Sequence, residues 1–231
     1  LGGSIMSQQI FDILGIGLRE DSYTDLLVNI FANSEEFRKN FLKLLKEEKY
    51  DNWEQVVRYS IGGNKPDWIL YNRELEKIIV IENKILSKEG LWQTDRYSSP
   101  EFKEAARNIL GIPDADFSFY LLSLNELNPR SPNFIPISYL DIRNCLPDVS
   151  DNSDISILAR ELKERIDEYY NWEKPKDDDE VFKYLRNVKG WVNIYSTFRI
   201  MAESIIEGEK YTKFYGSTQN RQNGYTPLAI W

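Results

Sequence analysis

Two acidic residues and a lysine stand at positions from which they could cleave a phosphodiester. Asp67 begins one expected strand, and Glu82 and Lys84 end the next strand along the chain. Residues i and i+2 of a strand face the same side of a sheet, so Glu82 and Lys84 project together. If the two strands pair as a hairpin, Asp67 lies beside them. Carboxylate oxygens could then hold a metal ion that activates water, while the ammonium orients or deprotonates the nucleophile.

Histidine is absent from the sequence. This excludes Ser-His-Asp and Cys-His catalytic sets, Cys/His zinc fingers and nucleases that bind their metal through histidine. Any catalysis must therefore use carboxylates, lysine, hydroxyls and amides. Because oxygen ligands suit Mg²⁺, Mn²⁺ or Ca²⁺, we expect Mg²⁺ or Mn²⁺ as the cofactor.

The pattern of apolar residues predicts the elements that would position these side chains. Helices are expected at 21–31, 89–97 and 101–110. A further helix is expected to begin at a capping box formed by Asn33 and Glu36. Strands are expected at 53–61, 67–71, 77–85 and 117–122. This order predicts an α/β fold in which helices flank a mixed sheet. The strand at 77–85 is apolar on both faces, so it should be central and covered on both sides.

Beyond residue 125 the sequence predicts a mainly helical extension. The chain is rich in loop residues up to about Pro136, and helices are expected at 138–145, 155–169 and 179–206. A hairpin is expected within 211–231. We interpret the acidic run at 177–180 as a helix N-terminus rather than a metal site.

Composition and charge restrict the setting of the protein. Its 231 residues are 42% hydrophobic, which is enough for a core. No stretch resembles a membrane span or a signal sequence, so we expect a cytoplasmic protein without a membrane partner. The single cysteine, Cys145, excludes an intrachain disulfide. The net charge of −8 weighs against tight nonspecific DNA binding, although acidic residues that hold a metal would also lower it.

The motifs resemble those of the PD-(D/E)XK nuclease superfamily. The resemblance lies in Pro66-Asp67, preceded by Gly62-Gly63, and in Glu82-Asn83-Lys84, and it covers about residues 20–122. It implies a restriction-endonuclease-like core over 6–125, with 126–231 as a helical extension packed on it. We expect residues 1–5 to be an added remnant outside the fold.

The resemblance also implies roles for individual residues. Asp67 and Glu82 would bind Mg²⁺, with the Asn83 main-chain carbonyl as a third ligand, and Lys84 would position the attacking water. Glu20 resembles an additional acid that completes the metal shell. Gln93 and Tyr97 resemble a Gln-x-x-x-Tyr helix, from which Gln93 would orient Lys84 or a phosphate.

Each of these residues has a simpler interpretation. Asp67, Glu82 and Lys84 could form a salt-bridge cluster at strand ends, although charges at the end of an apolar strand are costly unless they are paired or used. Glu20 could be a helix-terminal acid, and Asp21 and Asp25 compete for its role in the site. The pair Gln93 and Tyr97 could simply belong to an amphipathic helix.

The sequence therefore predicts a metal-dependent nuclease that acts on nucleic acid, with DNA as the expected substrate and defence against foreign DNA as a setting suggested by the resemblance. The alternative is a binding or regulatory module that kept the nuclease fold and lost hydrolysis. A third possibility is a partial enzyme that ends inside a sheet at Trp231.

Lys65 and Lys88 could contact phosphate, but lone lysines in loops are usually solvated. The oligomeric state stays open.

Overall fold

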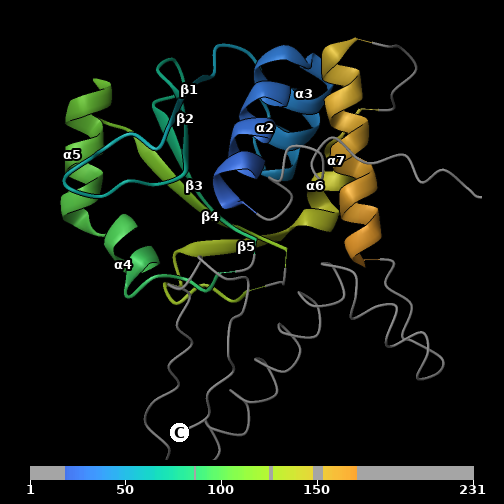
Figure 1. Ribbon diagram of the computed structural model, residues 1–231. Coiled ribbons are helices and arrows are strands. Elements are labelled where there is room, and N and C mark those ends of the chain that lie inside the picture. The colour runs from blue at the N-terminus through green and yellow to red at the C-terminus, as the bar shows by residue number, and fades with distance from the viewer. Residues whose placement is uncertain (1–18, 86, 125–126, 148–152, 171–231) are drawn as a thin grey trace, which may run out of the picture. The chain divides into compact units, whose positions relative to one another are not determined.

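A mixed sheet of five strands with helices on both faces forms the frame of the protein (Figure 1). The computed structural model describes residues 19–85, 87–124, 127–147 and 153–170, which all belong to one compact unit. The strands are β1 (Glu54–Val57), β2 (Trp68–Asn72), β3 (Lys77–Lys84), β4 (Asp116–Ser123) and β5 (Phe134–Ser138). The expected α/β class with a mixed, helix-flanked sheet is confirmed.

The strands follow one another in space as they do in the sequence. β1, β2 and β3 are antiparallel neighbours, whereas β4 and β5 continue the sheet in parallel. Trp68, the first residue of β2, lies opposite Ile81 of β3. β3 is therefore the central strand, and all of its residues except Lys77 are buried, as the apolar pattern predicts.

Two layers of helices cover the sheet (Figure 1). One layer contains α2 (Glu20–Asn33), α3 (Glu35–Leu44), α6 (Tyr139–Cys145) and α7 (Asp154–Tyr170). The other contains α4 (Gln93–Tyr97) and α5 (Pro100–Leu110). Each layer encloses its own hydrophobic core, because the buried side chains form two separate clusters on the two faces.

Side chains along β3 point alternately to the two faces of the sheet, and this alternation determines the face to which each polar side chain at the end of β3 points. Ile81 belongs to the core under α2 and α3, and Val80 belongs to the core under α5. Successive side chains of a strand point to opposite faces. Glu82 and Lys84 therefore point to the face of α4 and α5, and Asn83 points to the face of α2.

Aromatic packing attaches α2 and α3 to the start of β2. The Phe41 ring stacks on the Trp68 indole with 5.2 Å between centroids, and Phe31 meets the same indole edge-on at 5.4 Å. Burying each of these side chains is worth about 1.5–3 kcal/mol. Because Trp68 directly follows Asp67, this packing also fixes the backbone that carries Asp67.

Several element boundaries differ from the sequence-based prediction. Ser34, rather than Asn33, caps α3, because its hydroxyl accepts the Phe37 N–H at 3.2 Å. The expected helix at 89–97 is helical only from Gln93, and the expected strand at 53–61 contains only the four residues of β1. The helices expected at 138–145 and 155–169 are present as α6 and α7.

A strand replaces part of the loop expected before Pro136. β5 pairs with β4 from Phe134 to Ser138, so the sheet extends beyond residue 125. Proline lacks an N–H donor, and Pro136 is tolerated because β5 lies at the edge of the sheet. Residues 1–5, the acidic run at 177–180, the expected helix at 179–206 and the expected hairpin lie outside the described residues. None of the described helices combines the length and apolar character that crossing a bilayer requires.

Candidate active site

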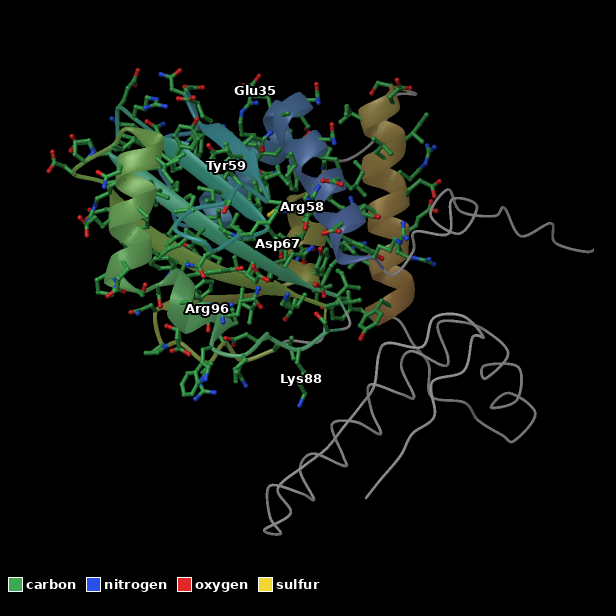
Figure 2. The ribbon with its side chains drawn as sticks, turned by 60° about the vertical axis from the view of Figure 1, so that its left-hand side comes forward. Glu35, Arg58, Tyr59, Asp67, Lys88 and Arg96 are labelled. Carbon is green, nitrogen blue, oxygen red and sulfur yellow. The ribbon has the colours of Figure 1, made fainter. Side chains whose placement is uncertain are left out.

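The end of β3 gathers charged side chains from three parts of the chain. Lys84 Nζ lies 2.7 Å from Glu82 Oε1, and Asp67 Oδ2 accepts the Asn83 backbone N–H at 2.8 Å. Asp67 lies on the face shown in Figure 2, close to Arg58, whose backbone N–H donates to the Asp67 carbonyl at 3.0 Å. The hairpin register places the two carboxylates next to each other, as the sequence predicts.

Glu82 is the most deeply buried acid of the group, with a residue exposure of 1%. Its Oε1 accepts hydrogen bonds from Lys84 and from the Gln93 amide. Its Oε2 is buried and has no hydrogen-bond partner. Burial and the neighbouring Asp67 carboxylate raise the pKa of Glu82 to about 8, despite the Lys84 ammonium. The single ammonium of Lys84 therefore does not offset the burial of Glu82 and the charge of Asp67.

Lys84 remains an ammonium in this setting. Burial opposes its charge, but the carboxylates of Glu82 and Glu20 outweigh that effect and raise the pKa of Lys84. The side chain is 7% exposed and lies 3.3 Å from Glu20 Oε1. A charged lysine donates hydrogen bonds and cannot accept a proton, so the geometry favours orientation of a nucleophile over its deprotonation.

Asp67 occupies a half-buried position between the loop from Gly62 and β2. Burial raises its pKa, whereas the Asn83 N–H and the Lys84 ammonium act in the opposite direction. The nearby Glu20 carboxylate raises the pKa of Asp67 further, because like charges disfavour ionisation, whereas the Glu82 carboxyl lowers it.

Glu20 reaches the site from the first turn of α2. Besides Lys84, its carboxylate accepts the Ile85 backbone N–H at 3.3 Å and the Ser87 hydroxyl. Asp21 and Asp25, which competed with Glu20 in the sequence, are instead ion-paired with Arg58. Glu20 thus extends over the end of β3, as expected, and its contacts are with Lys84 and the backbone that follows it.

Gln93 and Tyr97 meet the site from α4. The Gln93 amide donates to Glu82 Oε1 and to the Tyr97 hydroxyl, the latter at 3.2 Å. Tyr97 donates to the Lys65 carbonyl at 3.1 Å, next to Pro66 and Asp67. A single turn of helix therefore links Glu82 of β3 to the loop that leads to Asp67.

The Asn83 side chain is held on the opposite face by partners that the sequence did not single out. Its amide donates to Thr24 Oγ1 at 3.0 Å, and its carbonyl oxygen accepts the Tyr139 hydroxyl at 2.9 Å. Thr24 and Tyr139 belong to α2 and α6, far away in sequence, and their residue types carried no signal. This network fixes the backbone between Glu82 and Lys84.

The register also leaves the Asn83 main-chain carbonyl without a ladder partner from β2. Trp68 pairs with Ile81, so extending the register by two residues places Pro66 opposite Asn83. A residue's N–H and C=O point to the same side of a strand. Because the Asn83 N–H points to Asp67, the Asn83 carbonyl also faces the side on which Pro66 and Asp67 lie. Proline has no N–H to donate to that carbonyl.

These side chains fit a divalent cation. When all three acids are ionised, the carboxylates of Glu20, Asp67 and Glu82 against the ammonium of Lys84 leave a formal charge of −2. Within the described residues, no group of three or more Asp, Glu, Cys or His side chains forms a metal cage. Mg²⁺ does not need one, because it typically binds one or two carboxylates and keeps several waters. The unpartnered Glu82 Oε2 is a suitable ligand atom.

The structure thus brings Asp67, Glu82, Lys84, Glu20 and Gln93 into one cluster, with the Asn83 backbone between them. Comparisons with protein-family models, curated proteins and solved structures found no significant match. A function for the cluster must therefore be inferred from its chemistry and from the motifs that the chain carries.

Proposed function

We propose that this protein is a divalent-metal-dependent phosphodiester hydrolase of the PD-(D/E)XK type, a nuclease that acts on DNA. One observation carries the proposal. The Glu82 carboxylate is buried next to Asp67 and Lys84, and its Oε2 has no hydrogen-bond partner. Burying such a group is costly unless a cation completes its surroundings. The fold expected for this family, a restriction-endonuclease-like core, agrees with the hairpin that joins Asp67 to Glu82.

Asp67, Glu82 and the Asn83 main-chain carbonyl would hold Mg²⁺ or Mn²⁺. When bound, the ion supplies positive charge that activates a water molecule and stabilises the phosphoryl oxygens. The Asn83 backbone is kept in register by the Thr24 and Tyr139 contacts on the other face of the sheet. Holding the ligand atoms in place before the substrate arrives lowers the cost of reorganisation during the reaction.

Lys84 would position the attacking water or a phosphate oxygen through its charged ammonium. Glu20 contacts Lys84, and we assign it the role of holding that ammonium. A direct part for Glu20 in the metal shell would require it to leave Lys84, Ile85 and Ser87. Gln93 would restrain Glu82 through Oε1, which leaves Oε2 available to the cation.

Separate parts of the chain place cations around the site. Lys65 and Lys88 are exposed, and Lys88 points away from the body of the protein at the edge of the face shown in Figure 2. Arg96 is exposed on α4, and its Nε donates to the Asn64 side chain at 3.3 Å in the loop before Asp67. These residues could meet phosphates. Because the net charge is −8, we expect weak, salt-sensitive binding that divalent metal strengthens.

A cleavage assay tests the proposal. The purified protein would be incubated with Mg²⁺ or Mn²⁺ and with single-stranded, duplex and branched DNA and RNA. We expect metal-dependent cleavage of DNA that chelation stops and that Lys84→Ala abolishes. Absence of cleavage on every substrate, together with metal-dependent DNA binding, would favour the alternative of an inactive binding module. Wild-type turnover by Lys84→Ala would remove lysine from the mechanism.

Binding of Ca²⁺, which often supports binding without catalysis in this family, separates the metal site from the reaction. We expect Ca²⁺ to raise the melting temperature of the wild type and to have no effect on Glu82→Gln. Glu54→Gln is a matched control, since Glu54 is an acid that pairs with Arg73 at the protein surface. Equal stabilisation of both variants by Ca²⁺ would place the metal elsewhere. A defence role remains a proposal that follows from the resemblance alone.

A further inference from the structure

The segment between β3 and α4 exposes two large apolar side chains beside the candidate site. Leu91 is 76% exposed and Trp92 is 49% exposed. Trp92 directly precedes Gln93, the residue whose amide contacts Glu82. Since consecutive Cα atoms are about 3.8 Å apart, the indole begins very close to a side chain that contacts the proposed metal ligand. The indole is thus an exposed aromatic surface one residue away from the side chain that contacts Glu82.

The surroundings hold Trp92 in a backbone conformation that its residue type disfavours. Its φ of 55° lies in the left-handed region, which bulky side chains rarely adopt. Strain of this kind persists only where neighbouring contacts enforce it. Glu89 provides such contacts, because its carboxylate accepts the Thr94 N–H and the Arg130 N–H, both at 2.9 Å. Glu89 thus ties the segment of Trp92 to the segment of Arg130.

Arg130 covers the indole with a positive charge. The centre of its guanidinium lies 3.2 Å from the centroid of the Trp92 ring. The Arg130 side chain is still 49% exposed, and it is ion-paired with Asp95 at 3.3 Å. Aromatic rings and guanidinium planes are the surfaces on which proteins stack unpaired bases.

The charges around this stack suit an anionic ligand. Glu89 and Asp95, the acids of the segment 88–96, are engaged by Thr94 and Arg130. Lys88 and Arg96 are exposed on the same segment. Arg96 donates hydrogen bonds to neutral acceptors, the Leu91 carbonyl and the Asn64 side chain, and these bonds do not neutralise its charge. A nucleotide, with a flat base and a phosphate, matches this combination.

We propose that Trp92, stacked on Arg130, binds one unpaired base of the nucleic acid, so that the substrate is single-stranded or locally unpaired beside the bond that is cut. This inference rests on the proposed nuclease function and specifies its substrate class. Within a duplex, neighbouring base pairs cover the faces of each base, and a base must leave the stack to reach an aromatic side chain. The stack of Trp92 on Arg130, called the platform below, would therefore discriminate between nucleic-acid strands that are paired and strands that are not.

The test measures binding in Ca²⁺ by fluorescence anisotropy, with a labelled single-stranded oligonucleotide and the same sequence as a duplex. We expect the wild type to bind the single strand more tightly. Trp92→Ala should weaken single-strand binding roughly 5- to 150-fold, the range of base–aromatic stacking, and change duplex binding less than about twofold. Trp92→Phe, which keeps an aromatic face, should recover most of the affinity.

Two further variants make the result specific. Trp92→Gly removes the ring and also relieves the positive φ, so it should fold at least as stably as Trp92→Ala and still lose single-strand affinity. Leu140→Ala removes an exposed apolar side chain of α6, in the other helix layer, and should bind like the wild type. Equal losses on single strand and duplex, or no loss on either, would overturn the proposal.

The outcomes also separate this inference from the proposed function. Lys84-dependent cleavage of duplex DNA without any single-strand preference would leave the nuclease standing and overturn the platform. Trp92-dependent binding of single strands without cleavage of any substrate would support the platform and contradict the hydrolase. Sedimentation at increasing protein concentration tests a second copy as the occupant. A dimer that Trp92→Ala dissociates would overturn the proposal in favour of a protein interface.

Discussion

The Lys84 ammonium lies 3.3 Å from a Glu20 carboxylate oxygen that belongs to a residue 64 positions earlier in the chain. One end of this ion pair is on the central strand and the other is on the first turn of α2. The aromatic packing of Phe31 and Phe41 on Trp68 fixes the position of α2 against the sheet. The ion pair therefore depends on the fold as a whole and not on a local motif.

We expect Glu20→Gln to lower the cleavage rate about 10- to 100-fold while changing the melting temperature by only about one or two degrees. The amide keeps the shape of the side chain but loses the charge that holds the Lys84 ammonium. Asp21→Asn is the matched control, because Asp21 is a neighbouring acid that is 73% exposed and pairs with Arg58. Exposed pairs contribute little. Unchanged activity in Glu20→Gln would return Glu20 to the role of a helix-terminal acid.

Lys84→Ala should also destabilise the metal-free protein. Removing one partner of a buried ion pair typically costs about 3–5 kcal/mol where the other group stays charged, and we expect less here because Glu82, with a pKa of about 8, can take up a proton. Glu82 would then be a buried acid with only Gln93 as a donor on Oε1. The double variant Glu82→Gln/Lys84→Met should recover part of the loss. Urea unfolding of the three proteins without metal measures this, and equal stability of wild type and Lys84→Ala would show that the pair contributes nothing.

Much of the candidate site was predictable because its signals are local. The spacing of Glu82 and Lys84 follows from the two-residue period of a strand, and the polar turn after Asn72 indicates the hairpin that brings Asp67 to them. The apolar run of β3 indicates a central strand. These are the features that the structure places as expected.

The remaining features depend on contacts between distant segments. Thr24 and Tyr139 lie 59 and 56 residues from Asn83, and nothing in their residue types marks them as partners of that side chain. β5 was missed because Pro136 and the prolines before it indicate a loop, whereas an edge strand accepts a proline. Lys88, Arg96 and Arg130 do not form a basic stripe in the sequence, because Lys88 and Arg96 belong to the segment around the start of α4 and Arg130 to the loop before β5.

Tyr139→Phe should lower both stability and activity. It removes the hydroxyl that donates to Asn83 Oδ1, a carbonyl oxygen buried with the rest of Asn83. An unsatisfied buried acceptor costs about 1–3 kcal/mol. The Asn83 backbone then loses a restraint, so we expect a several-fold weaker affinity for Ca²⁺ in calorimetry. Tyr120→Phe is the control, since its buried hydroxyl donates to the Leu45 carbonyl on the same helix layer. A similar loss of Ca²⁺ affinity in both variants would contradict a specific role for Tyr139.

The Cys145 thiol should resist alkylation in the native protein. It is 6% exposed, and burial together with the nearby Asp141 carboxylate raises the pKa of the thiol to about 12. Only the thiolate reacts, and it is scarce at pH 8 under these conditions. We expect modification by iodoacetamide to be slow in buffer and fast in guanidinium chloride, as followed by mass spectrometry. Rapid labelling of the native protein would mean that α6 does not cover the thiol.

The last prediction concerns Pro66, which lies opposite Asn83 when the register of β2 and β3 is continued by two residues beyond Trp68 and Ile81. Any other residue at this position would carry an N–H that could donate to the Asn83 carbonyl and continue the ladder between β2 and β3. That carbonyl is the proposed third ligand of the metal, so a new hydrogen bond would compete with the ion. We expect Pro66→Ala to weaken Ca²⁺ binding several-fold in calorimetry. Its effect on unfolding should be small, because the added hydrogen bond offsets the greater entropy of an unfolded chain that has lost a proline, which is worth about 0.4–1 kcal/mol. Pro100→Ala is the matched control, since it removes a proline from the first turn of α5 without touching the site. Equal Ca²⁺ affinities in Pro66→Ala and wild type would show that the Asn83 carbonyl takes no part in metal binding.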